Sequence, residues 1–485
     1  MRNLTAEENQ MSGTDRPAAV LGVLAAAQFV VVLSTSIVNV ALPSVRDGVG
    51  LSGTGMAWVI NAYGLAFGAL LLLGGRAADL AGRRRVLLTG LSVFVAASLA
   101  AALATEPWLL IAARAAQGVG AAAIAPAALS LLMYVFPAGP GRARALGVWG
   151  AVSGAGGAAG VLLGGVLTES MGWRSVFHAT ALGAAVVLAA GVRWLPSAAS
   201  EGSDLRRLDL AGALTVTLGL VALVYSLTTA GRTGWTDPLV LGTAAAAAVL
   251  LALFAVVEHR HSAPLLPPSL LTRGSVAPAN LVMALLGAVW VGLFFFLPLY
   301  QQQVLGDSPL RTGLTQLPLA AANMAGAFLA PRIARRAGAS VTLVAGMAAL
   351  SGGLLWLSGI SANGTFTGDV LGPTVVIGLG LGVAFVQLTG AAVTGVPARD
   401  AGLAGGLVNT TRQLGGALGL AVLATLAASR TASASAGPGT SHAMALTEGY
   451  RTAFLVSAAV AAAGTALAPL LTRTPKPART KETTR

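Results

Sequence analysis

Two arginines lie inside segments that are otherwise free of charge, and their side chains have the clearest chemical consequence in this sequence. Arg114 stands in the run AARAAQGVGAA, and Arg412 follows Asn409 in another apolar run. A charge within such a segment is costly and normally faces a water-filled cavity or a partner, so both residues are candidates for a transport pathway. The structural alternatives are that Arg114 extends to a membrane surface, or that both arginines bond to backbone carbonyls and glutamines.

Few side chains could carry a proton past these arginines. All seventeen acids lie in loops or at the ends of apolar segments, which argues against the paired carboxylates of an enzyme. Asp79, Asp369 and His178 remain as possible proton carriers, the last because a histidine titrates near neutrality. Other groups that could line the same path, or only join helices by hydrogen bonds, are Ser34, Asn39 and Gln117.

A second set of polar and aromatic residues could line a cavity for a small-molecule substrate. They are Asn61, Trp290, Phe294, Gln316, Asn323, Asn409 and Arg412. An apolar pocket with a few polar groups suits a drug-like molecule, although lipid-facing packing accounts for any single aromatic residue equally well. No metal site or cofactor is expected, because the sequence has no cysteine, and His259 and His261 lack further ligands nearby.

The elements that must position these residues are membrane-spanning helices. Of the 485 residues, 55% are hydrophobic and only 10% are charged. Long charge-free runs can each supply roughly the 20 residues that a helix needs to cross a bilayer, the shortest by extending past Arg412. The runs are 17–45, 48–75, 86–105, 115–141, 145–168, 175–192, 210–231, 238–257, 274–306, 312–331, 337–368, 370–398, 413–429 and 452–472. An all-α membrane protein with fourteen transmembrane helices is therefore predicted.

The distribution of positive charge predicts how the chain is oriented. With a cytoplasmic N-terminus, 22 of the 30 lysines and arginines lie on the cytoplasmic side. We therefore expect a multi-pass protein of the cell inner (cytoplasmic) membrane with both termini cytoplasmic. The lipid bilayer then explains the net charge of +13 better than a nucleic-acid partner does. A monomer is expected.

The stretch from Gly75 to Leu88 is a short, arginine-rich connection between two of these helices. Its glycines permit tight turns, and Asp79 can pair with a nearby arginine or cap a helix. Because it lies outside any plausible cavity, we expect it to control conformational switching rather than substrate affinity. An ordinary basic connector is the alternative. The residues assigned to the switch are Gly75, Asp79, Gly82, Arg83 and Arg84.

One helix carries a stripe of glycines that allows close approach of another helix. The stripe consists of Gly147, Gly156, Gly160, Gly164 and Gly165. We expect it to pack against a helix of the opposite half of the molecule.

The second half of the sequence repeats features of the first. At an offset of 256 residues, Gly338 matches Gly82 and Arg335 falls at the position of Asp79. Such repeats are typical of transporters. The predicted organisation is an N-terminal tail (1–17), a six-helix bundle (18–195), a linker with a two-helix insert (196–273), a second six-helix bundle (274–473) and a basic tail (474–485).

Taken together, these features resemble the fourteen-span drug:proton antiporter branch of the major facilitator superfamily. The likeness extends from the run IVNVALP, which ends at Pro43, to the run RQLGGALG, which begins at Arg412. In that family, the residues matching Asp79 and its neighbours latch the two halves together. Those matching Arg114, Gln117 and Gly118 are linked to proton transfer. The glycine stripe seals the outer side of the bundle interface.

The chain departs from the family pattern at two positions. Ser34 stands where the family usually has an aspartate, and Val161 replaces a proline after the third glycine of the stripe. The resemblance implies export of amphipathic drugs or antibiotics by alternating access, with proton antiport. The missing aspartate leaves open a proton-independent transporter, or one of neutral or anionic cargo coupled through the cargo's own carboxylate. A membrane sensor that binds without transport also remains open.

Overall fold

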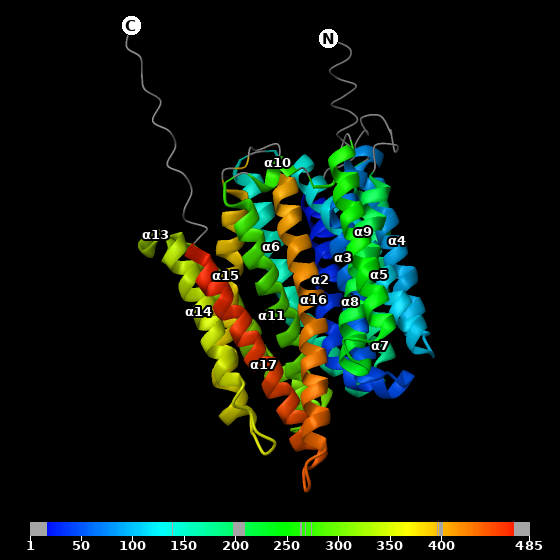
Figure 1. Cartoon of the computed structure of the whole chain (residues 1–485). Coiled ribbons are helices and arrows are strands. Elements are labelled where there is room, and N and C mark those ends of the chain that lie inside the picture. The colour runs from blue at the N-terminus through cyan, green and yellow to red at the C-terminus, as the bar shows by residue number, and fades with distance from the viewer. Residues whose placement is uncertain are drawn as a thin grey trace, which may run out of the picture.

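The structure, a computed structural model, describes residues 17–137, 139–196, 209–261, 264–266, 268–272, 274–394, 396 and 401–469. These residues form helices and no strand. Fourteen helices within them are long and apolar enough to cross a bilayer, so the predicted all-α class is confirmed. Figure 1 shows them as a bundle of roughly parallel helices.

The helices follow the charge-free runs closely. In the first half they are α2 (Pro17–Val49), α3 (Gly53–Ala81), α4 (Arg83–Ala102), α5 (Pro107–Val135), α6 (Pro140–Met171) and α7 (Arg174–Trp194). Next come α8 (Leu210–Thr233), α9 (Pro238–Arg260) and the short α10 (Pro268–Leu271). The second half contains α11 (Val276–Gln303), α12 (Pro309–Thr315), α13 (Leu317–Ala337), α14 (Ala339–Leu357), the π-helical turn η2 (Phe366–Val370), α15 (Leu371–Val393), α16 (Ala401–Ser435) and α17 (His442–Leu467).

The helices before α8 and those after α10 pack in the same pairwise pattern. In the first set α3 and α4 both contact α5, and α4 also contacts α7; in the second, α13 and α14 both contact α15, and α14 also contacts α17. In both sets, glycines allow the corresponding helices to approach each other closely. A Cβ on Gly120 would lie 2.9 Å from the carbonyl oxygen of Gly90, and one on Gly380 would lie 2.6 Å from that of Gly346. We call these two sets the N-half and the C-half.

Of the two helices that lie between the halves in the sequence, α8 contacts both halves. The rings of Trp58 in α3 and Tyr225 in α8 have centroids 6.5 Å apart. The Thr425 hydroxyl of α16 donates to the Leu227 carbonyl of α8 at 3.1 Å. α9 packs on α8 and leaves most of its surface exposed, as expected of a helix that faces lipid.

Glycines also form the equivalent turns of the two halves. Gly82 joins α3 to α4 with a φ of 97°, and Gly338 joins α13 to α14 with a φ of 85°. A side chain at either position would be strained, which confirms the sequence match between these two glycines. Gly75 differs from the prediction: it lies inside α3, which continues to Ala81, so it forms no turn.

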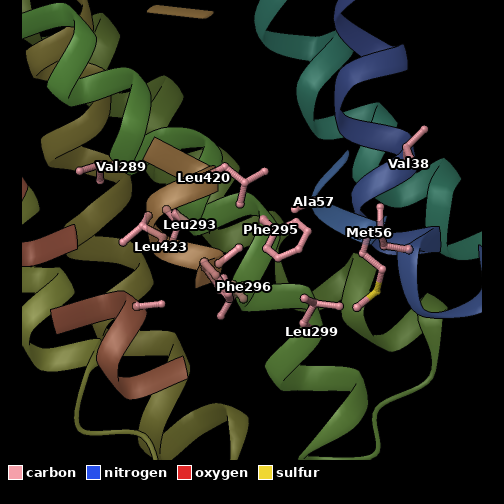
Figure 2. Packing of buried hydrophobic residues seen from close by; sticks show 14 of the residues in the cluster. Val38, Met56, Ala57, Val289, Leu293, Phe295, Phe296, Leu299, Leu420 and Leu423 are labelled. Carbon is pink, nitrogen blue, oxygen red and sulfur yellow. The ribbon is translucent and has the colours of Figure 1, made fainter. Parts of the chain in front are cut away.

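The halves meet through a hydrophobic core. Figure 2 shows Phe295 and Leu299 of α11 on the side that faces Met56 and Ala57 of α3. We name the end of the bundle at which α2 begins and α17 ends the near end, at the top of Figure 1, and the opposite end the far end.

Candidate functional site

Arg114 of α5 is enclosed by the N-half. Its side chain is 1% exposed. Its Nε donates to the Val59 carbonyl at 3.1 Å, and one terminal nitrogen donates to Oε1 of Gln117 at 2.8 Å. Gln117 then donates to the Ser98 hydroxyl at 2.7 Å. The guanidinium also lies 4.4 Å from the ring centroid of Tyr63. Arg114 thus bonds to a carbonyl and a glutamine, as the structural alternative predicts.

Arg412 of α16 has a more open environment. Its only hydrogen bond within the described residues is donated to Oδ1 of Asn409, at 2.8 Å. Its guanidinium carbon lies 5.6 Å from the ring centroid of Trp290 in α11 and 6.0 Å from that of Phe385 in α15. Arg412 and both aromatic residues are partly exposed although they lie well within their helices. Arg412 is therefore less enclosed than Arg114.

Glycine contacts position both arginines. A Cβ on Gly118 would lie 2.5 Å from the Tyr63 carbonyl oxygen, so α5 approaches α3 closely beside Arg114. A Cβ on Gly287 of α11 would lie 2.9 Å from the backbone carbonyl carbon of Arg412, and one on Gly415 would lie 2.6 Å from Cα of Ala284. The glycines of the run RQLGGALG therefore hold Arg412 beside Trp290.

Tyr63 lies against Arg114, and its hydroxyl donates a hydrogen bond to the Val31 carbonyl of α2 at 3.3 Å. Neither arginine has a carboxylate within salt-bridge distance among the described residues. Ser34 lies beside Tyr63 without a well-formed hydrogen bond, and both polar atoms of the buried Asn61 lack a partner there. This mid-bundle region therefore has two cations and several unsatisfied polar groups.

The structure brings only some of the predicted cavity residues together. Trp290, Phe294, Asn409 and Arg412 form one cluster, in which the rings of Trp290 and Phe294 are 6.2 Å apart. Asn39 is buried in α2. Asn323 is partly buried, and its backbone packs against Gly378 and Gly382 of α15. Gln316 lies at the junction of α12 and α13, and its amide has no partner in the described part of the chain.

Two predicted proton carriers lie away from this cluster. His178 is exposed near the start of α7, where Nδ1 bonds to the Arg174 carbonyl oxygen at 3.0 Å. Asp369 accepts a hydrogen bond from the Thr365 backbone nitrogen at 2.7 Å and so closes its own turn. Neither residue lies in the cluster around Arg412, because a segment free of charge does not reveal which way its terminal polar residues point. Their part in proton transfer stays a prediction.

The predicted switch residues lie at the near end and bond within the N-half. Asp79 is 3.9 Å from Arg83, whose guanidinium carbon lies 5.4 Å from the ring centroid of Tyr134. Arg84 donates to the Val192 carbonyl at 2.8 Å. No described residue of the C-half forms an ion pair or hydrogen bond with these side chains.

The glycine stripe faces mainly its own half, which corrects the prediction. Added Cβ atoms on Gly156, Gly160 and Gly164 would all meet backbone atoms of α2, at 3.2, 2.9 and 2.5 Å respectively. Gly147 has no neighbour within 4 Å of its Cβ position. Only Gly165 faces the C-half, where its Cβ would lie 2.5 Å from the Pro309 carbonyl oxygen. Helical spacing identifies the stripe but cannot say which helix fills it.

At the far end, contacts join the two halves directly. Glu169 of α6 accepts a hydrogen bond from the Leu310 backbone nitrogen at 2.9 Å, and Gln302 of α11 donates to the Val40 carbonyl at 2.8 Å. With the close approach of Gly165 to Pro309, we call these the far-end contacts. Sequence reasoning missed them, along with the positions of Tyr63 and Phe385. The run of three glutamines ending α11 and the acid ending α6 were the available signals.

The side chains that this arrangement brings together are suited to binding a small molecule. In the described residues, no group of three or more histidine, cysteine or acidic side chains could hold a metal ion. What the centre provides is positive charge, aromatic surface and hydrogen-bonding groups, with one end joined across the halves.

Comparisons with known proteins agree with this architecture. The chain is 43% identical over 422 residues to the cephamycin export protein CmcT of Amycolatopsis lactamdurans, covering 87% of each chain. It is 42% identical to the puromycin resistance protein pur8 of Streptomyces alboniger, covering 87% of this chain and 84% of that protein. An auto-inhibited peptide transporter of the POT family has the same fold, with a TM-score of 0.68, 15% identity and coverage of 94% and 97%. The sequence profile of the Major Facilitator Superfamily matches residues 24–420, and the chain belongs to that family of transporters.

Proposed function

We propose that this protein exports amphipathic small molecules, including antibiotics, from the cytoplasm by alternating access. The observation that carries the proposal is the cluster of Arg412, Asn409, Trp290 and Phe385, a charged and aromatic site well within the helices and partly exposed. The relatives named for cephamycin export and puromycin resistance support antibiotics as the cargo class.

In this proposal the near end faces the cytoplasm, as the distribution of arginines favours. The moving bodies are the bundles 18–195 and 274–473, and the segment 196–273 carries the two additional helices. With the far-end contacts formed, the central site would be reached from the cytoplasm. Release to the outside then requires Glu169 and Gln302 to leave their partners while the near end closes.

Proton antiport would need a titratable group that meets the cargo. The described acids lie at helix ends or in loops, and Ser34 occupies the position where the family usually has an aspartate. We therefore propose that coupling to protons runs through the ionisable group of the cargo itself. Imposing the pH gradient and the membrane potential separately on proteoliposomes tests this. Strong transport of a permanent dication driven by the pH gradient would contradict it.

The export function is tested by accumulation in cells that lack their own pumps. A panel of dyes and antibiotics, with a cephamycin and puromycin among them, is compared in cells with and without the protein. We expect lower steady-state accumulation of several amphipathic compounds, reversed when the membrane gradients are collapsed. Equal accumulation of the whole panel, with the protein present in the membrane, would contradict export.

A further inference from the structure

The two mid-bundle arginines differ in what they can still bind. Arg114 is enclosed, and its neighbours Val59, Gln117 and Tyr63 occupy the space around its guanidinium. Arg412 has one hydrogen-bond partner and two aromatic neighbours, and it remains partly exposed. A guanidinium has five donors, so most of the hydrogen-bonding capacity of Arg412 is unused by the described residues.

The unused donors face an environment with no compensating negative charge. The ion pairs among the described residues involve arginines near the helix ends or in the connections between helices, and Arg412 has none. A partly dehydrated cation without a counter-ion favours binding of an anion from outside the protein.

The surroundings also indicate what the rest of the ligand looks like. The rings of Trp290 and Phe385 are 5.7 Å apart at an angle of 65°, and Phe294 extends this aromatic surface along α11. Planar apolar groups pack well on such surfaces. Asn409 accepts one N–H of Nη2 of Arg412. The second N–H of Nη2, together with an N–H of Nε or Nη1, leaves one fork of the guanidinium for a carboxylate in the bidentate geometry that arginine prefers.

We propose that Arg412 binds the carboxylate of an aromatic, monoanionic cargo, whose planar part lies on Trp290 and Phe385, and that Arg114 does not contact the cargo. This deepens the proposed export function and rests on it. It assigns different roles to two arginines that look alike in the sequence. Arg412 would determine specificity for charge, whereas Arg114 would hold α3, α4 and α5 together.

The test measures binding of two probes that differ only in charge. The probes are 7-methoxycoumarin-4-acetate and its uncharged amide, titrated against the purified full-length protein in zwitterionic lipid nanodiscs. The zwitterionic lipid excludes anionic headgroups as competitors for the site. We expect wild type to bind the acetate about tenfold or more tightly than the amide, as for a charge-assisted hydrogen bond. Equal affinities, or tighter binding of the amide, would overturn the proposal.

Variants separate charge recognition from the aromatic surface. Arg412→Gln should abolish the preference for the acetate while the affinity for the amide changes by less than about threefold. Arg412→Lys should retain part of the preference, because it keeps the charge and loses the bidentate geometry. Trp290→Leu should weaken binding of both probes equally. An acetate preference that survives in a folded Arg412→Gln protein would overturn the proposal.

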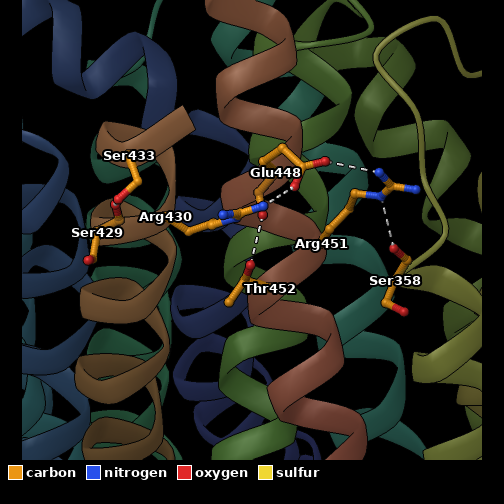
Figure 3. A network of polar contacts seen from close by, with 7 residues as sticks. All are labelled: Ser358, Ser429, Arg430, Ser433, Glu448, Arg451 and Thr452. Atoms are coloured by element: carbon orange, nitrogen blue, oxygen red, sulfur yellow. Dashed lines mark hydrogen bonds and ion pairs between the residues drawn. The ribbon is translucent and has the colours of Figure 1, made fainter. Parts of the chain in front are cut away.

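The same helix offers a matched control. Arg430 lies on α16 near the far end, where it donates to Glu448 at 3.0 Å in the exposed network of Figure 3. Arg430→Gln removes the same charge from the same helix and should leave both affinities unchanged. Because binding is measured without transport, a failure of the binding proposal can be told apart from a failure of the export proposal. Export of panel compounds with equal probe affinities would overturn only the role of Arg412.

Discussion

The contacts at the boundary between the halves differ between the two ends of the bundle. At the far end, Glu169 and Gln302 reach across it, and Gly165 brings α6 against the Pro309 backbone. At the near end, the charged side chains around Gly82 bond only within the N-half in the described chain. Alternating access requires the halves to separate at the far end and to form contacts with each other at the near end. The far-end contacts are thus the ones to be broken, and the near-end side chains are available to form new ones.

The largest effect is expected from bulk at the far-end boundary. Gly165→Leu places a side chain where even a Cβ would be 2.5 Å from the Pro309 carbonyl oxygen, so the far end should fail to close and transport should be nearly abolished. The substitution Gly164→Leu, one residue earlier, introduces bulk against α2 of the same half. It should instead lower the free energy of unfolding by ~1–3 kcal/mol. Gly147→Leu, with no neighbour within 4 Å, is the control and should resemble wild type.

These outcomes can be observed directly because the natural sequence has no cysteine. A single cysteine in place of the fully buried Thr312 of α12 reports whether the far end is open to a membrane-impermeant maleimide. Labelling should be slow in the parent and fast in Gly165→Leu. Slow labelling together with normal transport in Gly165→Leu would show that this glycine does not determine closure.

A second effect should arise at the near end. Asp79→Asn removes the acid 3.9 Å from Arg83. Because the observed pair is half-exposed, its loss should cost little in this state. The transport rate should nevertheless fall, by about tenfold, if the acid is needed when the near end closes. Binding of the coumarin acetate should be unchanged. Weak binding with a normal rate at saturation would place Asp79 in substrate recognition.

A smaller change should follow from Glu169→Gln. The amide keeps the size of the side chain but loses the charge that accepts from the Leu310 nitrogen. As exposed charged contacts are weak, we expect maleimide labelling of the Thr312→Cys reporter to rise only about two- to fivefold. Glu448→Gln, which breaks an exposed ion pair within the C-half, is the matched control. Equal increases in both variants would attribute the effect to general loosening.

The smallest effect concerns Asp307, in the loop before α12. Burial raises the pKa of this carboxyl, and the cation of Arg311, 3.0 Å away, partly opposes the rise. A folded-state pKa above the unfolded value means that the contribution to stability is greatest at low pH and is lost as pH rises. Between pH 7 and pH 5 wild type should therefore gain about 1–2 °C in Tm relative to Asp307→Asn. A relative loss at pH 5 would reverse the assigned sign.

Helix number and repeat structure could be predicted from sequence because they depend on local composition. Charge-free runs of sufficient length have few alternatives to a membrane helix, and the glycines at 82 and 338 require a backbone conformation that other residues avoid. The predicted cluster of Trp290, Asn409 and Arg412 also formed. Each of these residues is costly or distinctive in its own segment, so its importance was visible without knowledge of its neighbours.

What the sequence by itself determined is therefore the set of helices, the turns between them and the polar residues that are unusual within membrane-spanning segments. The tertiary structure decided which of these residues meet. It turned Gly156 toward α2 and only Gly165 toward the C-half, placed His178 on the surface, and enclosed Arg114 while leaving Arg412 open. The physical reason is that every helix offers several faces of similar polarity. Which face is buried depends on the shapes of helices distant in the chain.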